Sequence, residues 1–181
     1  KGVDEIVGMY FKVAEANFKD QKKFVFVGGS NTEHLDFIEE TFSVKVIEGR
    51  RLKKGDLDKA VLGYSYQFDD KIFSRGLRLG DKLDINSKKF EVIGFYEEIG
   101  NPQDDSNIFI TDEAFEQLFP ASKDKFGFIM ASSQKNVEPS ELASRIEEKL
   151  RKFKDQEEGK EDFFVQTFED ALATFNTIIN V

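Results

Sequence analysis

Apolar and polar residues alternate most regularly near the middle of the chain. Leu83-Asp84-Ile85 and the run from Phe90 to Phe95 both have the spacing that is typical of β-strands. Asn86-Ser87 separates the two runs and favours a tight hairpin turn. Because Phe90 and Val92 have the same parity along the second strand, we expect both side chains to point into a hydrophobic core.

The residues just before this hairpin predict a strand, a helix and a turn. Ala60–Gly63 is a short apolar run that ends on a glycine. Tyr64, Phe68 and Ile72 then recur every four residues, a spacing that predicts one face of a helix. Gly76–Asp81 is rich in turn-forming residues and leads into the hairpin.

The N-terminal part of the chain predicts two strands. Ile6–Ala16 alternates loosely and indicates a long strand, and Asn17–Lys23 predicts a polar turn. Phe24–Val27 is a continuous apolar run, so we expect a strand that is covered on both faces. Gly28-Gly29 is expected to end that strand.

A helix is predicted directly after the two glycines. Ser30-Asn31-Thr32-Glu33 has the spacing of a capping box, in which Ser30 would bond the amide of Glu33. A strand, glycines and a helix are also the parts of a phosphate-binding loop. The Gly-Lys-Ser/Thr ending and a complete GxGxxG are absent, which favours a plain turn. The face expected to turn inward carries Leu35, Ile38 and Phe42.

The segment Glu97–Asn107 has no apolar periodicity and contains glycine and proline, so we expect a mobile surface loop whose amides exchange early. Its alternative role is a partner-contact loop. Its acids do not follow the spacing of a calcium loop. Ile108–Ile110 predicts a strand, and Asp112 is placed to cap a short helix that Pro120 ends.

Strands and helices also alternate in the C-terminal part. Phe126–Ala131 and Phe163–Val165 predict strands. Pro139 is expected to be the first residue of an amphipathic helix. Thr167–Asp170 has capping-box spacing, and the apolar stripe from Phe168 to Val181 predicts a last helix.

The distribution of these predicted strands and helices indicates an α+β fold with two subdomains. Both ends of the chain mix strands and helices, whereas the middle consists mostly of strands and turns. We therefore expect residues 1–47 and 124–181 to form one split α+β subdomain, with residues 48–123 inserted as a β-rich subdomain.

Charge and composition exclude some functions. The net charge is −9, from 26 basic and 35 acidic residues, which argues against nucleic acid as a partner. The absence of cysteine removes disulfides, thiolate catalysis and cysteine-based zinc sites. No apolar run approaches the ~20 residues that span a bilayer.

No active site is visible in the sequence. His34 is the only histidine, and a bland surface histidine is the commoner interpretation of such a residue. Adjacent carboxylates on a helix or in a turn do not face one another. We therefore predict no catalytic, cofactor-binding or metal-binding residues and no cofactor. The paired acids are Asp69-Asp70, Glu97-Glu98, Asp104-Asp105, Glu147-Glu148 and Glu157-Glu158.

One resemblance covers residues 46–111. The order and spacing of these residues resemble the extracytoplasmic domain of MacB/FtsX/LolC-type ABC transporter permeases. A preceding Glu48-Gly49-Arg50 with Leu52 and Asp56 resembles the same family's pattern. The matching positions in the remaining part are Leu62-Gly63, Phe73, Gly80-Asp81, Ile85, Phe90, Val92, Gly94 and Ile108–Ile110.

The resemblance implies a non-enzymatic module of a membrane permease. The terminal subdomain would be porter-like and near the membrane, and the inserted β-rich subdomain would be distal. ATP would be hydrolysed by a separate nucleotide-binding subunit, joined through membrane helices that this sequence does not include. A MacB-like domain would transmit motion to export or to a partner, a LolC-like one would engage lipoprotein traffic, and an FtsX-like one would activate a cell-wall hydrolase.

The implied location is the cell membrane, with the domain on its extracytoplasmic side. A second permease copy and an extracytoplasmic protein are the further partners implied. In this interpretation the chain continues into a membrane helix at each end. We then expect Lys1 and Val181 on one face, within roughly 25 Å, which allows a few helix diameters.

The alternative is a free-standing soluble α+β enzyme or small-ligand-binding protein whose site is assembled from scattered residues. An apolar segment of about 20 residues on each side of this sequence in the parent gene would favour the permease. The absence of both would favour the alternative.

Overall fold

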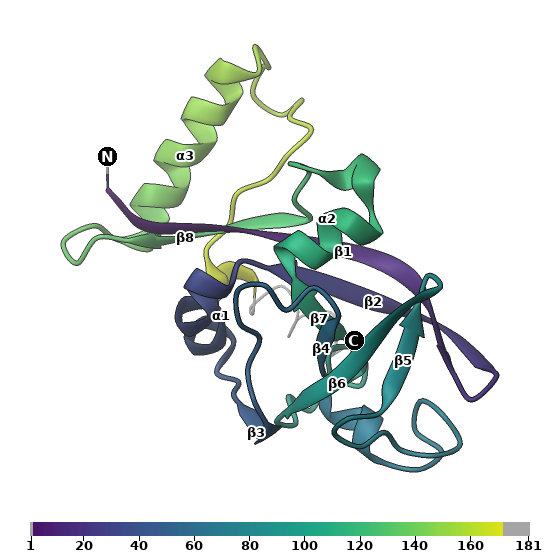
Figure 1. Cartoon of the computed structure of the whole chain (residues 1–181). Helices are drawn as coiled ribbons and strands as arrows, with labels where there is room; N and C mark the ends of the chain where they lie inside the picture. The colour runs from purple at the N-terminus through teal and green to yellow at the C-terminus, as the bar shows by residue number, and fades with distance from the viewer. Residues whose placement is uncertain (1, 172–181) are drawn as a thin grey trace, which may run out of the picture. The chain divides into compact units, whose positions relative to one another are not determined.

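The computed structural model describes residues 2–171 and has an α+β fold, as predicted (Figure 1). The chain divides into two compact units, Val7–Met130 and Lys1–Ile6 with Ala131–Val181, which we call the barrel unit and the terminal unit. The strands and helices are β1 (Val3–Phe18), β2 (Gln21–Ser30), α1 (Leu35–Phe42), β3 (Val46–Gly49), β4 (Lys59–Leu62), β5 (Lys82–Ile85), β6 (Lys88–Tyr96), β7 (Ile108–Thr111), α2 (Asp112–Leu118), β8 (Phe128–Ser133) and α3 (Pro139–Phe153).

Neighbouring strands of the barrel unit close into a ring. The sheet runs in the order β2-β7-β4-β6-β5-β1, and β1 in turn pairs with β2. β3 pairs with the C-terminal end of β6, outside this ring. Each strand of the ring has a partner on both sides, so the ring forms a small closed barrel.

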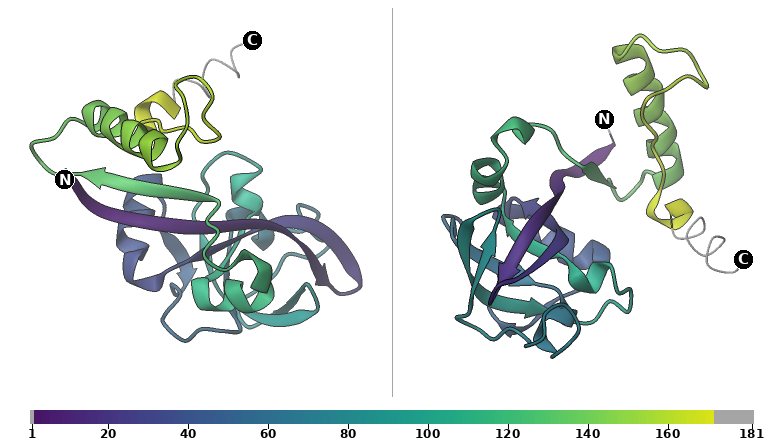
Figure 2. Two further views of the ribbon diagram at one scale, coloured as in Figure 1. Left: turned by 90° about the horizontal axis from the view of Figure 1, so that it is seen from above. Right: turned by 90° about the vertical axis from the view of Figure 1, so that its right-hand side faces the viewer.

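Two tight hairpins shape the barrel. β1 and β2 form a long hairpin, in register from Tyr10 opposite Gly29 to Phe18 opposite Gln21 (Figure 2). Its turn residues Lys19 and Asp20 have positive φ angles of 49° and 63°, as two-residue hairpin turns require. The predicted turn at Asn86-Ser87 joins β5 to β6 in the same way, with φ angles of 46° and 67°.

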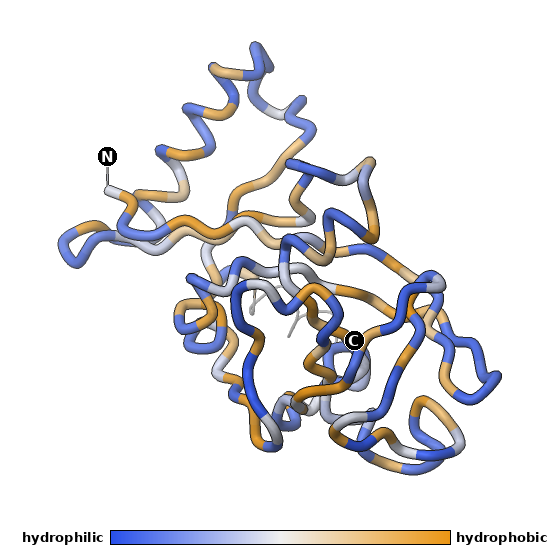
Figure 3. The backbone as a smooth tube through the Cα atoms, viewed as in Figure 1, coloured by the Kyte–Doolittle hydropathy of each residue, from blue (hydrophilic) through white to orange (hydrophobic). Residues whose placement is uncertain are grey.

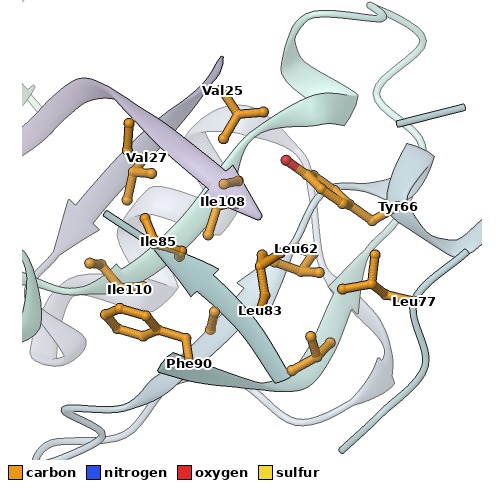
Figure 4. Close-up of a cluster of buried hydrophobic side chains, with 14 of the residues drawn as sticks. Val25, Val27, Leu62, Tyr66, Leu77, Leu83, Ile85, Phe90, Ile108 and Ile110 are labelled. Carbon is orange, nitrogen blue, oxygen red and sulfur yellow. The ribbon is translucent and has the colours of Figure 1, made fainter. Parts of the chain in front are cut away.

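The barrel interior is filled by apolar side chains from every strand of the ring (Figure 4). Phe90 and Val92 are both 0% exposed, so the prediction that they point into the core is confirmed. Helix α2 adds Phe115 to this core, and its ring stacks on Tyr10 with the centroids 4.9 Å apart. In Figure 3 the central strands are mostly hydrophobic, whereas the turn between β1 and β2 is hydrophilic.

A second apolar cluster lies on the outer side of the barrel. Val61 and Ile93 alternate with interior residues of β4 and β6, so they point away from the interior. Leu35 and Ile38 of helix α1 pack against them, as the helical spacing predicts. Phe42, predicted to face inward with them, is exposed.

Strand β2 differs from its prediction in two respects. Val25 and Val27 are buried, but Phe24 is 77% exposed, so the strand is covered on one face only. The glycines do not end the strand, because β2 continues to Ser30. A side chain at Gly29 would overlap the ring of Phe115, which explains why the strand carries a glycine there.

Two helix starts are capped by a neighbour of the predicted residue. The amide of Glu33 donates to Oδ1 of Asn31 (2.9 Å) rather than to Ser30, because Ser30 belongs to β2. Thr111, not Asp112, caps α2, and its Oγ1 accepts from the amide of Ala114 (3.1 Å).

The helix predicted across Tyr64, Phe68 and Ile72 is absent. Only Tyr64–Gln67 forms a short 3-10 turn. The chain then folds back, and the amide of Leu77 donates to the carbonyl of Tyr66 (2.8 Å). This bond from a distant residue takes a carbonyl that a continuing helix would need.

The terminal unit contains α3, which begins at Pro139 as predicted. Phe163–Val165 is not a strand, and Phe164 is 81% exposed. The predicted capping box at Thr167–Asp170 is confirmed, because the amide of Asp170 donates to Thr167 Oγ1 (3.0 Å) and the amide of Thr167 to Asp170 Oδ2 (3.3 Å). Most of the helix predicted from Phe168 to Val181, and the proximity of the two ends, lie outside the described residues.

The compact units divide the chain at other positions than the predicted subdomains, 1–47 with 124–181 and 48–123. The reason is hydrogen bonding across the expected boundary. β1 pairs with β5 and β2 pairs with β7, so strands from the N-terminal segment complete the barrel of the middle segment. The functional division into a membrane-proximal and a distal subdomain stays a prediction.

Candidate functional site

Gly49, Arg50 and Asp56, which carry part of the resemblance, hold the segment after β3 in place; we call the Arg50–Asp56 ion pair the clip. Arg50 Nη1 and Nη2 donate to the two carboxylate oxygens of Asp56 at 2.7 and 3.1 Å, and the amide of Lys53 donates to Asp56 Oδ2 at 2.8 Å. Burial raises the pKa of the Asp56 carboxyl, but the bonds from Arg50 and Lys53 outweigh it and hold the pKa below its usual value. Gly49 has a φ of 78°, and a Cβ there would overlap the carbonyl oxygen of Ile93.

Gly80-Asp81 also serves the fold. Asp81 Oδ2 accepts from the amide of Arg78 (2.8 Å) and from Nη2 of Arg75 (2.6 Å). The amide of Gly80 donates to the carbonyl of Val92 (2.8 Å), which fixes this turn against β6. The residues that carry the resemblance therefore stabilise turns and core contacts, and in this structure they are not arranged as reacting groups.

The candidate titratable residues are dispersed. His34 is the last residue of the 3-10 turn Thr32–His34, directly before α1, and is half-buried. Among the residues described, no three His, Cys, Asp or Glu side chains lie close enough to hold a metal ion. Of the paired acids, Asp104, Asp105 and Glu97 line a pocket. That pocket is the candidate site.

The pocket has a volume of about 300 Å³ and lies entirely within the barrel unit. Phe11 and Phe109 meet edge to face, with ring centroids 6.4 Å apart, and Phe11 lies 6.0 Å from Phe128. Aromatic edges and faces of this kind favour another ring in contact with them. The principal apolar side chains of the wall are Met9, Phe11, Ile38, Phe42, Phe109 and Phe128.

Tyr96 completes the apolar wall. Its ring meets Phe109 edge to face at 5.2 Å, and its hydroxyl donates to Glu39 Oε1 at 3.5 Å. Burial, together with the nearby charge of Glu39, raises the pKa of the Tyr96 hydroxyl. The hydroxyl therefore stays protonated at neutral pH and serves as a hydrogen-bond donor.

The loop from Glu97 to Asn107 forms the polar wall. Its buried Asp105 carboxylate accepts from the amides of Ile99 (2.8 Å) and Gly100 (3.1 Å). The loop assignment is confirmed, and its mobility stays a prediction. We expect the hydrogen bonds to Asp105 to slow exchange at the amides of Ile99 and Gly100.

Asn107 is held in place but has an unpaired acceptor. Its amide donates to the carbonyl of Asp104 (3.2 Å), and its carbonyl accepts from the amide of Gly63 (2.9 Å). The residue is 5% exposed, and its side-chain Oδ1 has no hydrogen-bond partner in the described part of the chain. Buried acceptors of this kind are uncommon and call for an explanation.

Carboxylates border the pocket. Glu97, Asp104 and Asp105 all line it. Burial raises the pKa of the Asp104 carboxyl, and the neighbouring charge of Asp105 raises it further. This combination of an apolar wall with an acidic border favours a ligand that is apolar and neutral or positively charged.

An exposed apolar strip adjoins the pocket. We call Val13, Phe24 and Phe26 the hairpin ledge, and they are 52%, 77% and 36% exposed. Val13 lies directly opposite Phe26 on the neighbouring strand, and the Phe26 ring lies 6.1 Å from Phe11, a pocket residue. The sequence analysis missed this surface, although Phe24 and Phe26 share one parity and Val25 and Val27 the other.

Residues 1–149 match the family described as MacB-like periplasmic core domain. The chain belongs to this family. It is the extracytoplasmic core domain of a MacB-like ABC transporter permease, as the resemblance implied. The matched family is one of permease domains and not of enzymes, so the alternative of a free-standing enzyme has no family support.

One relative is named as an ABC transporter permease. The chain is 30% identical over 181 residues to the uncharacterized ABC transporter permease MJ1507 of Methanocaldococcus jannaschii. The match covers 100% of this chain and 44% of that permease, so the chain spans less than half the length of its relative. In residues 2–171, no helix has the length and apolar character needed to cross a bilayer.

Solved structures share the fold. The extracellular domain of the transporter YknZ from Gram-positive bacteria matches with a TM-score of 0.67 and 16% identity, over 92% of this chain and 83% of that one. The periplasmic region of MacB from Actinobacillus actinomycetemcomitans matches with a TM-score of 0.67 and 16% identity, over 97% and 77%. At these identities the likeness concerns the fold.

Proposed function

We propose that this domain transmits motion driven by ATP hydrolysis from the membrane part of its permease to an exported substrate or to a partner protein outside the cytoplasm. ATP is hydrolysed in a separate nucleotide-binding subunit, which contacts the permease through membrane helices beyond this sequence. A second permease copy is a further partner. The domain itself binds no nucleotide and carries out no chemical step.

The observation that carries the proposal is the family match over residues 1–149. Two structural features support it. The residues that carry the resemblance hold turns together, as Arg50 does with Asp56, so in this chain they fix a shape. The barrel is closed and its interior is filled by buried apolar side chains, and close-packed interiors deform little and transmit displacement as one body.

Spin labels at two positions test the proposal in the full-length permease with its ATPase, reconstituted in a bilayer. The 181-residue chain contains no cysteine, so Lys82→Cys and Lys149→Cys supply the labelling sites within the domain. Lys82 lies in β5 of the barrel unit and Lys149 in α3 of the terminal unit. Cysteines elsewhere in the permease are replaced beforehand.

We expect the distribution of distances between the two labels to shift when a non-hydrolysable ATP analogue is added. A matched pair, Lys45→Cys with Lys82→Cys, lies wholly within the barrel unit and should not change. If the distance between labels at 82 and 149 is the same with and without nucleotide, and transport still proceeds, the two units do not move relative to each other and transmission of motion from the terminal unit to the barrel unit is ruled out.

A further inference from the structure

We propose that the pocket bordered by Asn107 and the acidic loop binds a tryptophan or tyrosine side chain that is followed by a lysine or arginine in a partner polypeptide. The inference rests on the proposed function only in placing that partner outside the cytoplasm. The binding itself is argued from the walls of the pocket, one buried acceptor, the charge of its border and the surface beside it.

The walls select an aromatic group. Phe11, Phe109 and Phe128 line the cavity, and a ring placed there would gain contacts with several aromatic side chains. A volume of about 300 Å³ lies at the small end of the range for ligand sites. It therefore suits one large side chain better than an extended molecule.

Asn107 selects a donor on that ring. Its backbone is fixed by hydrogen bonds at both the amide and the carbonyl, so its side-chain oxygen cannot easily withdraw to solvent. Oδ1 is closed to solvent and unpaired among the described residues, so the side chain of Asn107 turns toward the cavity when a ligand enters. Because Oδ1 only accepts, that ligand must carry an N–H or O–H. Tryptophan and tyrosine combine a ring with such a donor, whereas phenylalanine and methionine do not.

The border selects a positive neighbour. The Asp105 carboxylate is already bonded to the amides of Ile99 and Gly100, which leaves Glu97 and Asp104 to face an incoming group. Asp104 also lies next to the like charge of Asp105. A lysine or arginine beside the aromatic residue would relieve this repulsion and strengthen the complex.

The hairpin ledge favours a polypeptide over a free small molecule. Val13, Phe24 and Phe26 extend the apolar surface from the pocket along the β1–β2 hairpin. A ligand that fills only the pocket would leave this strip in water. A chain that inserts one side chain and continues along the hairpin would cover it, as exposed apolar patches at protein interfaces are covered.

Indole fluorescence provides the test because the 181-residue chain contains no tryptophan. The probe is the capped peptide acetyl-Gly-Trp-Lys-Gly-amide. Its matched control replaces tryptophan by 3-benzothienylalanine, which has the same shape but no N–H, and is measured by competition. We expect saturable binding with a blue shift of the indole emission, and an affinity of the control lower by about tenfold, the equivalent of one hydrogen bond.

Two variants locate the effect. Asn107→Leu should remove the difference between the two peptides, since the acceptor is gone. Replacing the lysine of the probe by glutamate should weaken binding several-fold to the unmodified chain and much less to Glu97→Gln. If Asn107→Leu fails to fold, the pair of peptides on the unmodified chain still decides whether the donor matters.

Equal affinity of the tryptophan and benzothienyl peptides for the unmodified chain would overturn the role of Asn107. Tryptamine binding as tightly as the peptide would overturn the polypeptide partner and indicate a small-molecule site. The absence of saturable binding at millimolar peptide would overturn the site as a whole. None of these results bears on transmission of motion, which the spin-label distances test independently.

Discussion

The two faces of strand β2 carry similar side chains in different surroundings. Val25 and Val27 point into the barrel and are buried among residues of β7, β5 and β6 (Figure 4). Phe24 and Phe26 alternate with them and lie on the exposed hairpin ledge. Both faces are apolar, so their side chains do not explain why only one is covered. The inner face stabilises the fold, and we infer that the outer face binds a partner.

The largest expected effect comes from the inner face. Phe90→Ala should lower the free energy of unfolding by about 3–5 kcal/mol, because it leaves a cavity in a closed barrel. That loss is a large part of a typical stability of about 5–15 kcal/mol. Urea unfolding followed by circular dichroism measures it. An unchanged midpoint would show that Phe90 does not support the core.

A smaller effect is expected from the buried Asp105 carboxylate, which holds the loop beside the pocket. Asp105→Ala should cost about 1–3 kcal/mol, since the amides of Ile99 and Gly100 lose their acceptor. Asp104→Ala is the matched control and should cost less, because the Asp104 carboxyl is the one whose pKa is raised by burial and repulsion. If Asp104→Ala proves the more damaging change, Asp105 does not hold the loop together.

Acid should weaken the clip between Arg50 and Asp56. The pKa of the Asp56 carboxyl is lower in the folded chain than in the unfolded chain, so its stabilisation is present above the unfolded value and is lost as the pH falls through the folded value. Asp56→Asn should therefore lose about 1 kcal/mol at pH 7 and differ less from the unmodified chain near pH 2. Melting temperatures across this range measure the convergence. A gap that stays constant with pH would rule out the ionised carboxylate as its source.

The smallest effect should come from the hairpin ledge. Phe24→Ser should change the free energy of unfolding by no more than about 0.5 kcal/mol, because the side chain is already exposed. The same urea experiment used for Phe90→Ala measures it. A loss of several kcal/mol would mean that Phe24 is covered, and the contrast between the two faces of β2 would fail.

The sequence predicted the local elements better than the way they combine. The β5–β6 hairpin depends on adjacent residues, and both its turn and the burial of Phe90 could be predicted from alternation. The barrel depends on pairing between β1 and β5 and between β2 and β7, which no local pattern specifies. The missing helix after Tyr64 has the same cause, since the bond from Leu77 comes from beyond the segment.

The pocket was harder still to predict. Met9, Ile38, Asn107 and Phe128 are far apart in the sequence and meet only when the barrel closes. The sequence predicted a mobile surface loop at Glu97–Asn107, with partner contact as the alternative, but it could not show that Oδ1 of Asn107 would be buried without a partner in the described part of the chain. A polar residue directly before the apolar run Ile108–Ile110 is the one signal that was available.

Hydrogen exchange of the 181-residue chain, with and without the tryptophan-lysine peptide, tests most directly whether the binding surface is separate from the core. We predict that saturating peptide slows exchange at amides of the loop Glu97–Asn107. The amides of β5 and β6 should stay unchanged, because they are already protected by pairing around the interior. Protection that rises equally in both regions, or in neither, would contradict a binding surface separate from the core.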